Sequence, residues 1–415
     1  MSEWIVKSLS ELVSFQKGRK VATSPFSLMG YEPYLGAGAL SGEYDGYASS
    51  LFAVQANEDD VLMLWDGERS GLCRSGLKGI VSSTVCKLTP KKNIRSEFLY
   101  YYLANNYEWI QARRTGTGVP HVPKDIGRML KIQFPKSTKK QQEIANILIA
   151  VDKVIEKTNV LIKKYQQINH GLMYDLFTRG IDHNNKLRPV SIDAPEIYYE
   201  SCLKFIPKGW RVQTLSTACE WFSGGTPSKK NDNWWKGDIP WLSPKDMKYF
   251  DLSDTQDHIT EDGAYYGSKI MPKNTTFIVV RGMILAHSFP VVINSKAFSF
   301  NQDIKALIPK DYINRRFLAY WFVANSSLFL EKTTEATHGT KRFDMKDLYS
   351  TEICIPPMDE QEKIVERLDT ISEKINSEKR YRSKLLFKRK ALMKDLLTEN
   401  PRMKKAEEKI EAPHV

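Results

Sequence analysis

The sequence predicts an α+β protein built from two similar halves, each a mixed α/β module followed by a long helix. The first observation is a repeat. The stretch KQQEIANIL, from Lys140, returns as EQEKIVERL, from Glu360, and residues 172–178 return as residues 392–398. The second observation is a heptad pattern in these stretches, and the third is a set of strand-like runs ahead of them. Two copies of one module imply two related binding surfaces.

The long helices follow from the spacing of apolar residues, which alternates between four and three as in a coiled-coil seam. Each helix should contain about 40 residues and extend about 60 Å. The seam of the first copy comprises Ile144, Leu148, Val151, Ile155, Thr158, Ile162, Tyr165, Asn169, Leu172 and Leu176. The seam of the second copy comprises Ile364, Leu368, Ile371, Ile375, Glu378, Arg382, Leu385, Arg389, Leu392 and Leu396.

The two helices should pack on each other in antiparallel fashion. The first helix should end near Phe177 and the second module should begin near Trp210, so only about 30 residues connect them. An antiparallel pair needs no long return path, and it would place the modules at opposite ends of the pair. The polar seam residues Thr158, Glu378 and Arg382 would either fix the register of the helices or face a partner subunit.

The globular modules also repeat. Trp4 matches Trp210 and Gly18 matches Gly224, and further matches are Leu9 with Leu215 and Ser10 with Ser216. Short β-rich runs predict strands in equivalent places of the two modules, at residues 60–65, 83–88, 275–280 and 303–309. Each module is therefore predicted to contain an irregular mixed sheet.

Composition narrows the class of protein. A chain of 415 residues with 41% hydrophobic residues can form two or three globular domains. The N-terminus has no signal-peptide pattern, and no apolar run reaches the roughly 18 residues of a membrane span, so we expect a cytoplasmic protein without membrane contact. The five cysteines are scattered without a CxxC pair, which favours buried reduced thiols over zinc ligands or disulfides.

The net charge of +12 and the isoelectric point near 9.2 indicate a polyanionic partner, most commonly nucleic acid. Simple solubility is the alternative explanation. Loops rich in glycine and basic residues recur in both modules, at residues 15–26 and 222–241 and again at residues 112–125 and 335–347. One such loop is most simply a solvated turn, but recurrence in both copies favours phosphate or base contact. The candidate DNA-binding residues are Arg19, Lys20, Arg113, Arg114, His121, Thr226, Ser228, Lys229, Lys230, Lys245, His338, Lys341 and Arg342.

Catalytic motifs are missing from the sequence. It has no P-loop and no Asn-Pro-Pro or Asp-Pro-Pro aromatic motif of a DNA methyltransferase. Residues 36–38 (GAG) have no counterpart in the second copy, and residues 303–305 (DIK) are better explained as part of a core strand than as a nuclease metal site. We therefore expect no catalytic residues and no metal site in this chain.

Taken together, the chain from about Trp4 to Asn400 resembles the specificity subunit of type I restriction-modification systems. The resemblance rests on the order of module, helix, module, helix and on several stretches. These are IPPMDEQEKI from Ile355 with its counterpart FPKSTKKQQEI from Phe134, LMYDLFTRGI from Leu172, IPKGWRVQTL from Ile206, and GGTPS, DIPWLSPKDM and FNQDIKAL in the second module. The start of the first helix departs from the family pattern, because it lacks the usual Pro-Pro-Leu and Glu-Gln residues.

The resemblance implies a fold and a function. The fold would be two target recognition domains separated by two long antiparallel coiled-coil helices. Each domain would read one half of a bipartite target in double-stranded DNA, and the helices would set the spacing and dock two methyltransferase subunits. Two motor-nuclease subunits are expected to join them. The chain would bind no cofactor itself, because S-adenosylmethionine, ATP and Mg would lie on partner subunits that methylate adenine at N6 and cleave DNA.

The expected domain boundaries follow from the same repeat. They are a first target recognition domain at 1–134, a first spacer helix at 135–180, a linker at 181–208, a second target recognition domain at 209–353, a second spacer helix at 354–400 and a charged tail at 401–415. Two rival functions remain open at this point. One is a stand-alone DNA-modifying enzyme, either nuclease or methyltransferase, and the other is a coiled-coil adaptor that binds only protein.

Overall fold

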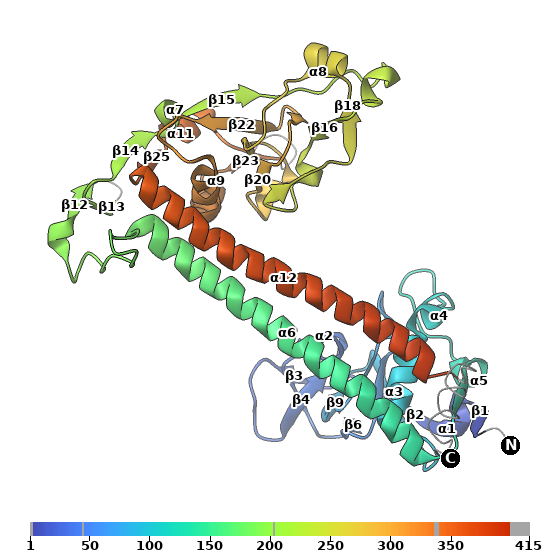
Figure 1. Cartoon of the computed structure of the whole chain (residues 1–415). Helices are drawn as coiled ribbons and strands as arrows, with labels where there is room; N and C mark the ends of the chain where they lie inside the picture. The colour runs from blue at the N-terminus through green and yellow to red at the C-terminus, as the bar shows by residue number, and fades with distance from the viewer. Residues whose placement is uncertain (1–2, 44, 202–203, 336–339, 399–415) are drawn as a thin grey trace, which may run out of the picture. The chain divides into compact units, whose positions relative to one another are not determined.

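The computed structural model describes residues 3–43, 45–201, 204–335 and 340–398 (Figure 1). The chain divides into two compact units. The first unit contains residues 1–161 and 378–415, and the second contains residues 162–377. Each unit holds one globular module together with part of both long helices. We call these the first and the second module.

The long helices are α6 (Thr138–Thr178) and α12 (Met358–Leu396). Every predicted seam position is buried or half-buried, so the heptad interpretation is confirmed. In the first unit, Arg389 of α12 donates to Asp152 of α6 at 2.5 Å, and Arg382 donates to Asn159 at 3.3 Å. Because α12 numbers fall as α6 numbers rise, the pair is antiparallel, as predicted. Arg382 thus bonds across the seam, whereas the buried Thr158 hydroxyl donates to Val154 on its own helix.

The first module contains two sheets. One has the strand order β2-β10-β7-β8, and the other has the order β3-β5-β4-β9-β6. The strands are β2 (Val13–Lys17), β3 (Thr23–Ser24), β4 (Tyr31–Leu35), β5 (Tyr47–Ser49), β6 (Gln55–Ala56), β7 (Val61–Leu64), β8 (Cys73–Ser75), β9 (Gly79–Val81) and β10 (Val85–Pro90). A further pair joins β1 (Trp4–Ser8) to β11 (Lys131–Pro135). The helices are α1 (Leu9–Leu12), α2 (Ala37–Ser41), α3 (Ser96–Asn105), α4 (Tyr107–Gln111) and α5 (Ile126–Met129).

The second module repeats this plan with two sheets in the orders β15-β22-β19-β20-β17 and β18-β16-β21. The strands are β15 (Cys219–Ser223), β16 (Ile239–Leu242), β17 (Asp251–Leu252), β18 (Asp257–Ile259), β19 (Thr276–Val279), β20 (Val291–Asn294), β21 (Ser299–Phe300) and β22 (Ile304–Pro309). Two further pairs join β14 (Arg211–Thr214) to β25 (Glu352–Ile355) and β23 (Thr334–Glu335) to β24 (Lys341–Arg342). The helices are α7 (Leu215–Ala218), α8 (Glu261–Gly267), α9 (Arg315–Ala324), α10 (Ser326–Glu331) and α11 (Met345–Ser350), with 3₁₀ turns η2 (Asp232–Trp235), η3 (Pro244–Asp246) and η4 (Met283–Ala286).

The two modules share strand order and strand direction. In the first module β4 runs antiparallel to β5 and parallel to β9. In the second module β16 runs antiparallel to β18 and parallel to β21. Likewise β10 lies between β2 and β7, as β22 lies between β15 and β19. The four predicted strands are present as β7, β10, β19 and β22, so the repeat seen in the sequence is also a repeat of topology.

The joint between each module and its long helix is a buried glutamine. Gln141 bonds to the carbonyl oxygens of Pro135 and Asn93 and accepts from the Arg95 N–H, at 2.8–3.1 Å. Gln361 makes the equivalent three bonds to Pro356, Tyr312 and Asn314, at 2.7–3.0 Å. Neither glutamine has any exposed surface. Each therefore satisfies three backbone groups that no regular element pairs, and this explains why glutamine occurs at this place in both copies.

A second joint is asymmetric. Tyr101 of α3 and Tyr320 of α9 occupy equivalent positions, and each donates to an aspartate of the following long helix, Asp152 at 2.9 Å and Asp369 at 2.6 Å. Burial, together with the nearby carboxylate, raises the pKa of both phenols. In each unit an arginine pairs with this aspartate, but the two arginines come from different helices. Asp152 is paired by Arg389 of α12, whereas Asp369 is paired by Arg316 of α9 itself.

The segment between α6 and the second module, expected to be a linker, is organised around one buried carboxylate. Glu360 is 5% exposed and accepts from Arg188 at 2.5 and 2.8 Å, from the Ile181 N–H at 2.8 Å and from Trp210 Nε1 at 3.2 Å. Gly180 has a φ of 61°, and a Cβ there would meet Glu360 and Trp210. The segment also contains η1 (Pro195–Ile197) and a hairpin of β12 (Tyr198–Ser201) and β13 (Lys204–Pro207), which the sequence analysis did not predict.

The interior of each module is apolar and holds protonated thiols. Burial raises the pKa of Cys86 to about 11 and that of Cys219 to about 12. Cys73 is also buried and Cys354 is half-buried, and Cys73, Cys86 and Cys219 are free thiols, as predicted. Cys202 lies outside the described residues. No helix in the described part of the chain is long and apolar enough to cross a membrane.

Candidate nucleic-acid interface

The first basic loop leaves its sheet at a glycine in both modules. A Cβ at Gly18 would lie 2.2–2.3 Å from the carbonyl oxygens of Ser82 and Val81, just at the end of β9. A Cβ at Gly224 would lie 2.2–2.6 Å from the carbonyl oxygens of Phe300 and Asn301, at the end of β21. Only glycine allows this approach of two backbones. The match between Gly18 and Gly224 thus fixes the start of both loops at the same place.

In the first module a single carboxylate joins the first basic loop, at residues 15–26, to the second basic loop, at residues 112–125. Asp66, two residues after β7, pairs with Lys17 Nζ at 2.8 Å and with His121 Nδ1 at 2.7 Å. Arg19 and Lys20, two and three residues after Lys17, are exposed, and neither has an ion-pair partner among the described residues. The predicted residues Arg19, Lys20 and His121 are therefore brought to adjoining loops.

The two arginines of the second loop are anchored to backbone. The Arg113 guanidinium lies 3.9 Å from the centre of the Trp109 ring and donates to the Trp109 carbonyl oxygen at 3.1 Å. Arg114 donates to the carbonyl oxygens of Glu68 at 2.6 Å and Gln111 at 2.9 Å. Part of each guanidinium is thus used to hold the loop against α4. The remaining N–H groups stay free to bind an anion.

In the second module the equivalent loops meet at an arginine. Arg281, two residues after β19, pairs with Asp303 at 2.6 Å, and the next N–H, of Gly282, donates to the carbonyl oxygen of Lys341 at 2.9 Å. The Thr226 hydroxyl donates to Gln302 at 2.6 Å, one residue before Asp303. Thr226 and Lys341 are therefore brought to one place. Lys341 is partly neutralised by Glu335 at 3.7 Å, and Arg342 is exposed.

The charge at this meeting point is inverted between the modules. An antiparallel bridge joins Asp66 to His121 in the first module, and the equivalent bridge joins Arg281 to Arg342 in the second. The sequence analysis placed His121 and His338 in matching loops, but Arg342 is the residue aligned with His121. His338 lies outside the described residues. The two surfaces therefore share a frame while carrying different side chains, which is the property that two different half-sites require.

The other predicted residues lie on the approach to η2 and on η3. Ser228 accepts from the Lys230 N–H at 3.3 Å, the Lys229 ammonium lies 4.9 Å from the centre of the Trp235 ring, and Lys230 is exposed. Lys245 instead pairs with Asp257 at 2.9 Å, and this hydrogen bond raises the pKa of its ammonium. Lys245 is thereby committed to an intramolecular ion pair, although half of its side chain stays exposed.

Sequence reasoning missed Lys17, Asp66, Arg281 and Asp303. The first three lie at strand ends whose pairing could not be read from the chain. Asp303 was noticed but assigned to a core strand, whereas it precedes β22 and holds Arg281. Among the described residues, no group of three or more His, Cys, Asp or Glu side chains is arranged to hold a metal ion.

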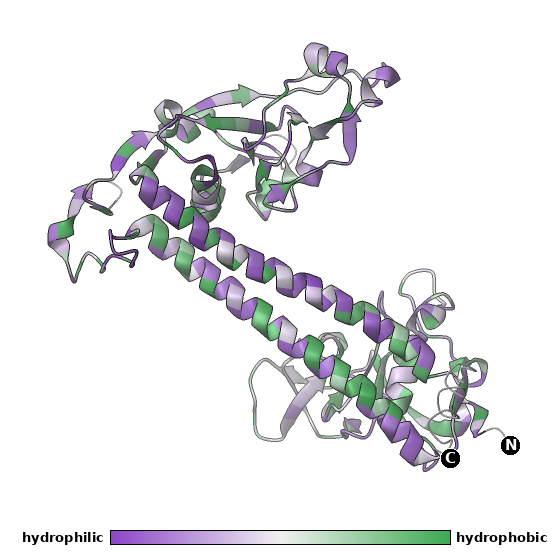
Figure 2. Cartoon of the chain, in the orientation of Figure 1, coloured by the Kyte–Doolittle hydropathy of each residue, from purple (hydrophilic) through white to green (hydrophobic). Residues whose placement is uncertain are grey.

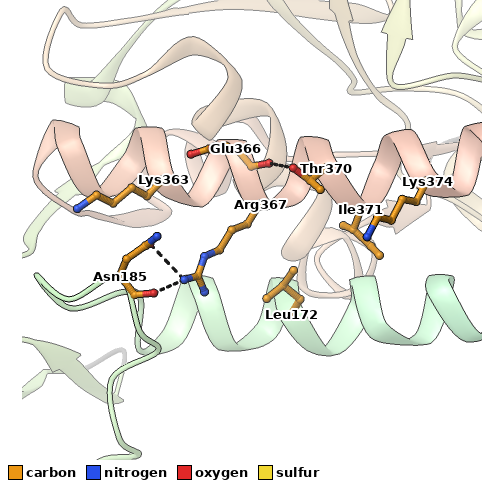
Figure 3. A pocket seen from close by; sticks show the side chains of 8 residues that line it. All are labelled: Leu172, Asn185, Lys363, Glu366, Arg367, Thr370, Ile371 and Lys374. Carbon is orange, nitrogen blue, oxygen red and sulfur yellow. Dashed lines mark hydrogen bonds between the residues drawn. The ribbon is translucent and has the colours of Figure 1, made fainter.

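A groove on the long helices was not predicted either. In the second unit it is lined by both helices and by Asn185 (Figure 3). Arg367 donates to Asn185 Oδ1 at 3.2 Å and to its carbonyl oxygen, so it ties the segment after α6 to α12. The lining residues are Leu172, Asn185, Lys363, Glu366, Arg367, Thr370, Ile371 and Lys374. Three cations against one carboxylate make the groove mildly basic.

The repeat is matched by a known family. The model of the type I restriction modification DNA specificity domain matches the chain twice, over residues 1–169 and 207–386. The chain belongs to this family. Each match covers one module and a large part of the helix that follows it. The specificity-domain family therefore accounts for the repeat and for the α+β architecture.

Relatives and solved structures agree with this family. The chain is 27% identical to the type I restriction enzyme MjaVIII specificity subunit of Methanocaldococcus jannaschii, over 97% of this chain and 94% of that protein. It is 34% identical to the EcoR124I/EcoR124II specificity subunit of Escherichia coli over 43% of this chain and 45% of that protein. The crystal structure of a type I restriction-modification S subunit from M. genitalium superposes with a TM-score of 0.61, at 17% identity, covering 96% of both chains. This last likeness shows the fold alone.

Proposed function

We propose that the chain is the DNA specificity subunit of a type I restriction-modification complex, in which each module reads one half of a bipartite target. The observation that carries this proposal is that the basic loops have the same backbone arrangement in both modules but carry different side chains. Both begin at a glycine held against a neighbouring strand, yet one is centred on Asp66 and the other on Arg281. Duplicated frames with divergent surfaces suit two different half-sites of one duplex.

We further propose that this chain carries no catalysis of its own. Methyl transfer from S-adenosylmethionine to adenine N6, and ATP- and Mg-dependent cleavage, would reside on partner subunits. Two carboxylates that could act chemically near the loops are engaged within the chain. Asp303 is paired with Arg281, and Asp66 is paired with Lys17 and His121. The double-stranded DNA would be held here while the target base is exposed to a partner.

An apolar stripe beside the seam of α6 supports docking of two methyltransferase subunits. Ile147, Val154, Leu161 and Ile168 recur at a strict heptad spacing, each one residue before a seam position. Ile147, Val154 and Ile168 are 46%, 39% and 45% exposed, which is unusual for an apolar stripe without a partner. Figure 2 shows more hydrophobic residues along the ribbon of α6 than along that of α12. Two motor-nuclease subunits would join the same assembly.

The decisive experiment is to map methylated adenines in a host with and without this gene. A bipartite motif with a fixed gap that disappears with the gene supports the proposal. If the purified chain alone methylates or cleaves DNA, the chain is a stand-alone enzyme, whatever its deletion does to the methylation pattern. If the chain binds the methyltransferase subunit but the complex has no affinity for DNA, the chain is a protein adaptor.

Binding to DNA should depend strongly on salt. With about six to ten phosphate contacts in the assembled complex, the slope of log affinity against log salt concentration should lie near −5 to −9. The unpaired Arg19 and Lys20 and the exposed Lys229, Lys230 and Arg342 are the described sources of these contacts. Fluorescence anisotropy of a labelled duplex across a salt series measures the slope. A slope near zero would contradict phosphate contact.

Base reading should separate by module. Replacing Arg342 by Ala, if its exposed guanidinium reads a base, should relax one position of the second half-site, with about 1–3 kcal/mol of lost discrimination. Replacing Lys20 by Ala, if it contacts phosphate, should weaken all sequences equally. Methylation of a randomised target library by the reconstituted complex provides the measurement. A change in the first half-site caused by Arg342→Ala would refute the assignment of one module to each half-site.

A further inference from the structure

The C-terminal half of α12 concentrates positive charge. Residues 379–394 contain eight Lys or Arg residues and no Asp or Glu. The part of α12 that belongs to the second unit, residues 358–377, contains six carboxylates and three cations. The part of α6 in the first unit, residues 138–161, contains four lysines and three carboxylates. Solubility alone does not account for cations that are collected on one half of one helix.

Three of these cations form a row. Arg380, Lys384 and Lys388 follow one another at intervals of four residues, so they lie along one side of the helix, and all three are exposed. We call them the basic row. Among the described residues none of the three has an ion-pair partner, whereas the following Arg389 and Lys390 each pair with a carboxylate. The row is therefore available to an external anion.

The fold of the chain does not explain the basic row. Like charges four residues apart repel each other and destabilise a helix. A cation gains from the helix dipole only in the last turn, and that turn contains Lys394 but no member of the basic row. The row therefore costs stability in the free chain, and the binding of an anion would remove that cost.

The basic row adjoins the candidate nucleic-acid interface of the first module. Lys390 follows the row by two residues and pairs with Glu108 of α4 at 3.4 Å (Figure 1). The next residue of α4, Trp109, carries the Arg113 guanidinium over its ring, at the start of the second basic loop. The row and this loop thus flank the same short helix. A polyanion that contacts the loop is the partner that best fits the row.

The length of the row matches the backbone of DNA. Eight residues separate Arg380 from Lys388, which corresponds to about 12 Å along a helix. One strand of B-DNA presents a phosphate about every 3.4 Å along its axis, so the row spans about three or four phosphates. Long basic side chains reach phosphate oxygens without touching the bases.

We propose that the basic row binds phosphates of the DNA beside the first half-site, outside the bases that the first module reads. This inference rests on the proposed function. The contact would add affinity that is the same for every sequence, because phosphates carry no base identity. The long helix α12 would then hold unread DNA directly, besides connecting the two modules.

The test uses the complex reconstituted with its methyltransferase subunits and duplexes that carry the mapped target. Uncharged methylphosphonate linkages replace single phosphates, one duplex at a time, across both half-sites and their flanks. Glutamine replaces the cations, because it keeps a long side chain and a high helix propensity. The row variant combines Arg380→Gln, Lys384→Gln and Lys388→Gln. The matched control removes three exposed charges from α6 of the same unit and combines Lys139→Gln, Lys153→Gln and Lys157→Gln.

For the wild-type complex we expect a several-fold loss of affinity when any of two or three neighbouring phosphates beside the first half-site is neutralised. The row variant should bind the unmodified target about tenfold more weakly, and its slope of log affinity against log salt should be smaller in magnitude by about 2 to 3. The same linkages should no longer affect the row variant. The control should keep the affinity, the slope and the sensitivity of the wild type.

A row variant that keeps the wild-type salt slope, or that still responds to the same linkages, overturns the inference. A row variant that no longer assembles with the methyltransferase subunits in analytical ultracentrifugation also overturns it, because the row would then bind an acidic protein surface. A wild-type complex that does not distinguish the target from a scrambled duplex overturns the proposed function instead.

Discussion

Inserting one heptad into each long helix should lengthen the unread gap of the DNA target and leave both half-sites unchanged. Seven residues extend a helix by about 10 Å, which corresponds to about three base-pair steps at 3.4 Å each. A heptad preserves the phase of the seam, so the helices can still pack. An oblique arrangement of the helices along the duplex would give a smaller increase. The mapped methylation sites of the reconstituted complex measure the gap.

The structure indicates where the two insertions should face each other. Asn159 of α6 is bonded to Arg382 of α12, so a heptad placed after Val160 lies opposite one placed after Tyr381. A single insertion in α6 is the internal control, because it leaves α12 one heptad short and should lower activity. Methylation at full rate with an unchanged gap in the double insertion would show that the helices do not set the spacing.

Replacing Arg188 by Ala should destabilise the second unit by about 3 kcal/mol. The substitution removes the two Arg188 N–H donors of the Glu360 carboxylate, and among the described residues only the Trp210 indole and the Ile181 N–H then donate to it. A buried carboxylate without its cation is costly, typically by about 3–5 kcal/mol, and water entering the vacated space should bring the value to the lower end. Urea unfolding followed by tryptophan fluorescence measures the change.

The repeat itself supplies the control for this prediction. Lys140 occupies the place of Glu360 in the first copy and pairs with Glu3 at 3.2 Å on the surface. Replacing Lys140 by Ala should change stability by less than about 1 kcal/mol, because exposed ion pairs contribute little. Combining Arg188→Met with Glu360→Leu should recover only part of the lost stability, since an apolar pair needs no ionic partner but leaves the Ile181 N–H and the Trp210 indole without their acceptor. Equal effects of Arg188→Ala and Lys140→Ala would refute the role assigned to burial.

The architecture could be predicted from the sequence because its signals are periodic. The seam residues from Ile144 to Leu176 and from Ile364 to Leu396 repeat at a spacing that only a helix pair explains, and all of them are withdrawn from solvent. The strands β7, β10, β19 and β22 were predictable for the same reason, because each is a short apolar run bounded by turn residues. The hairpin of β12 and β13 was not, since its strands are short and its polar residues resemble a linker.

The candidate interface was only partly predictable. Loops such as residues 112–125 could be selected by composition and recurrence, but the partner of each charge depends on strand pairing. His121 was chosen beside His338, yet Arg342 is the residue that shares its place, because β24 pairs with the strand before the loop. Lys245 looked available, and the structure pairs it with Asp257 twelve residues further on.

The core of the first module includes residues from the end of α12, and this has a consequence for the order of folding during synthesis. Met393, Leu396 and Leu397 belong to the same buried cluster as Phe98 and Phe134, and Arg389 completes the pairing of Asp152. Ribosomes deliver the N-terminal residues first, and domains generally fold in that order. The core of the first module cannot close until residues 389–397 have been synthesised. In the second module the equivalent arginine, Arg316, belongs to the module itself, and its partner Asp369 lies near the start of the helix that follows. The half of the protein that is made first is therefore the half that is finished last, and its apolar surface stays open to chaperones or to misassembly until then.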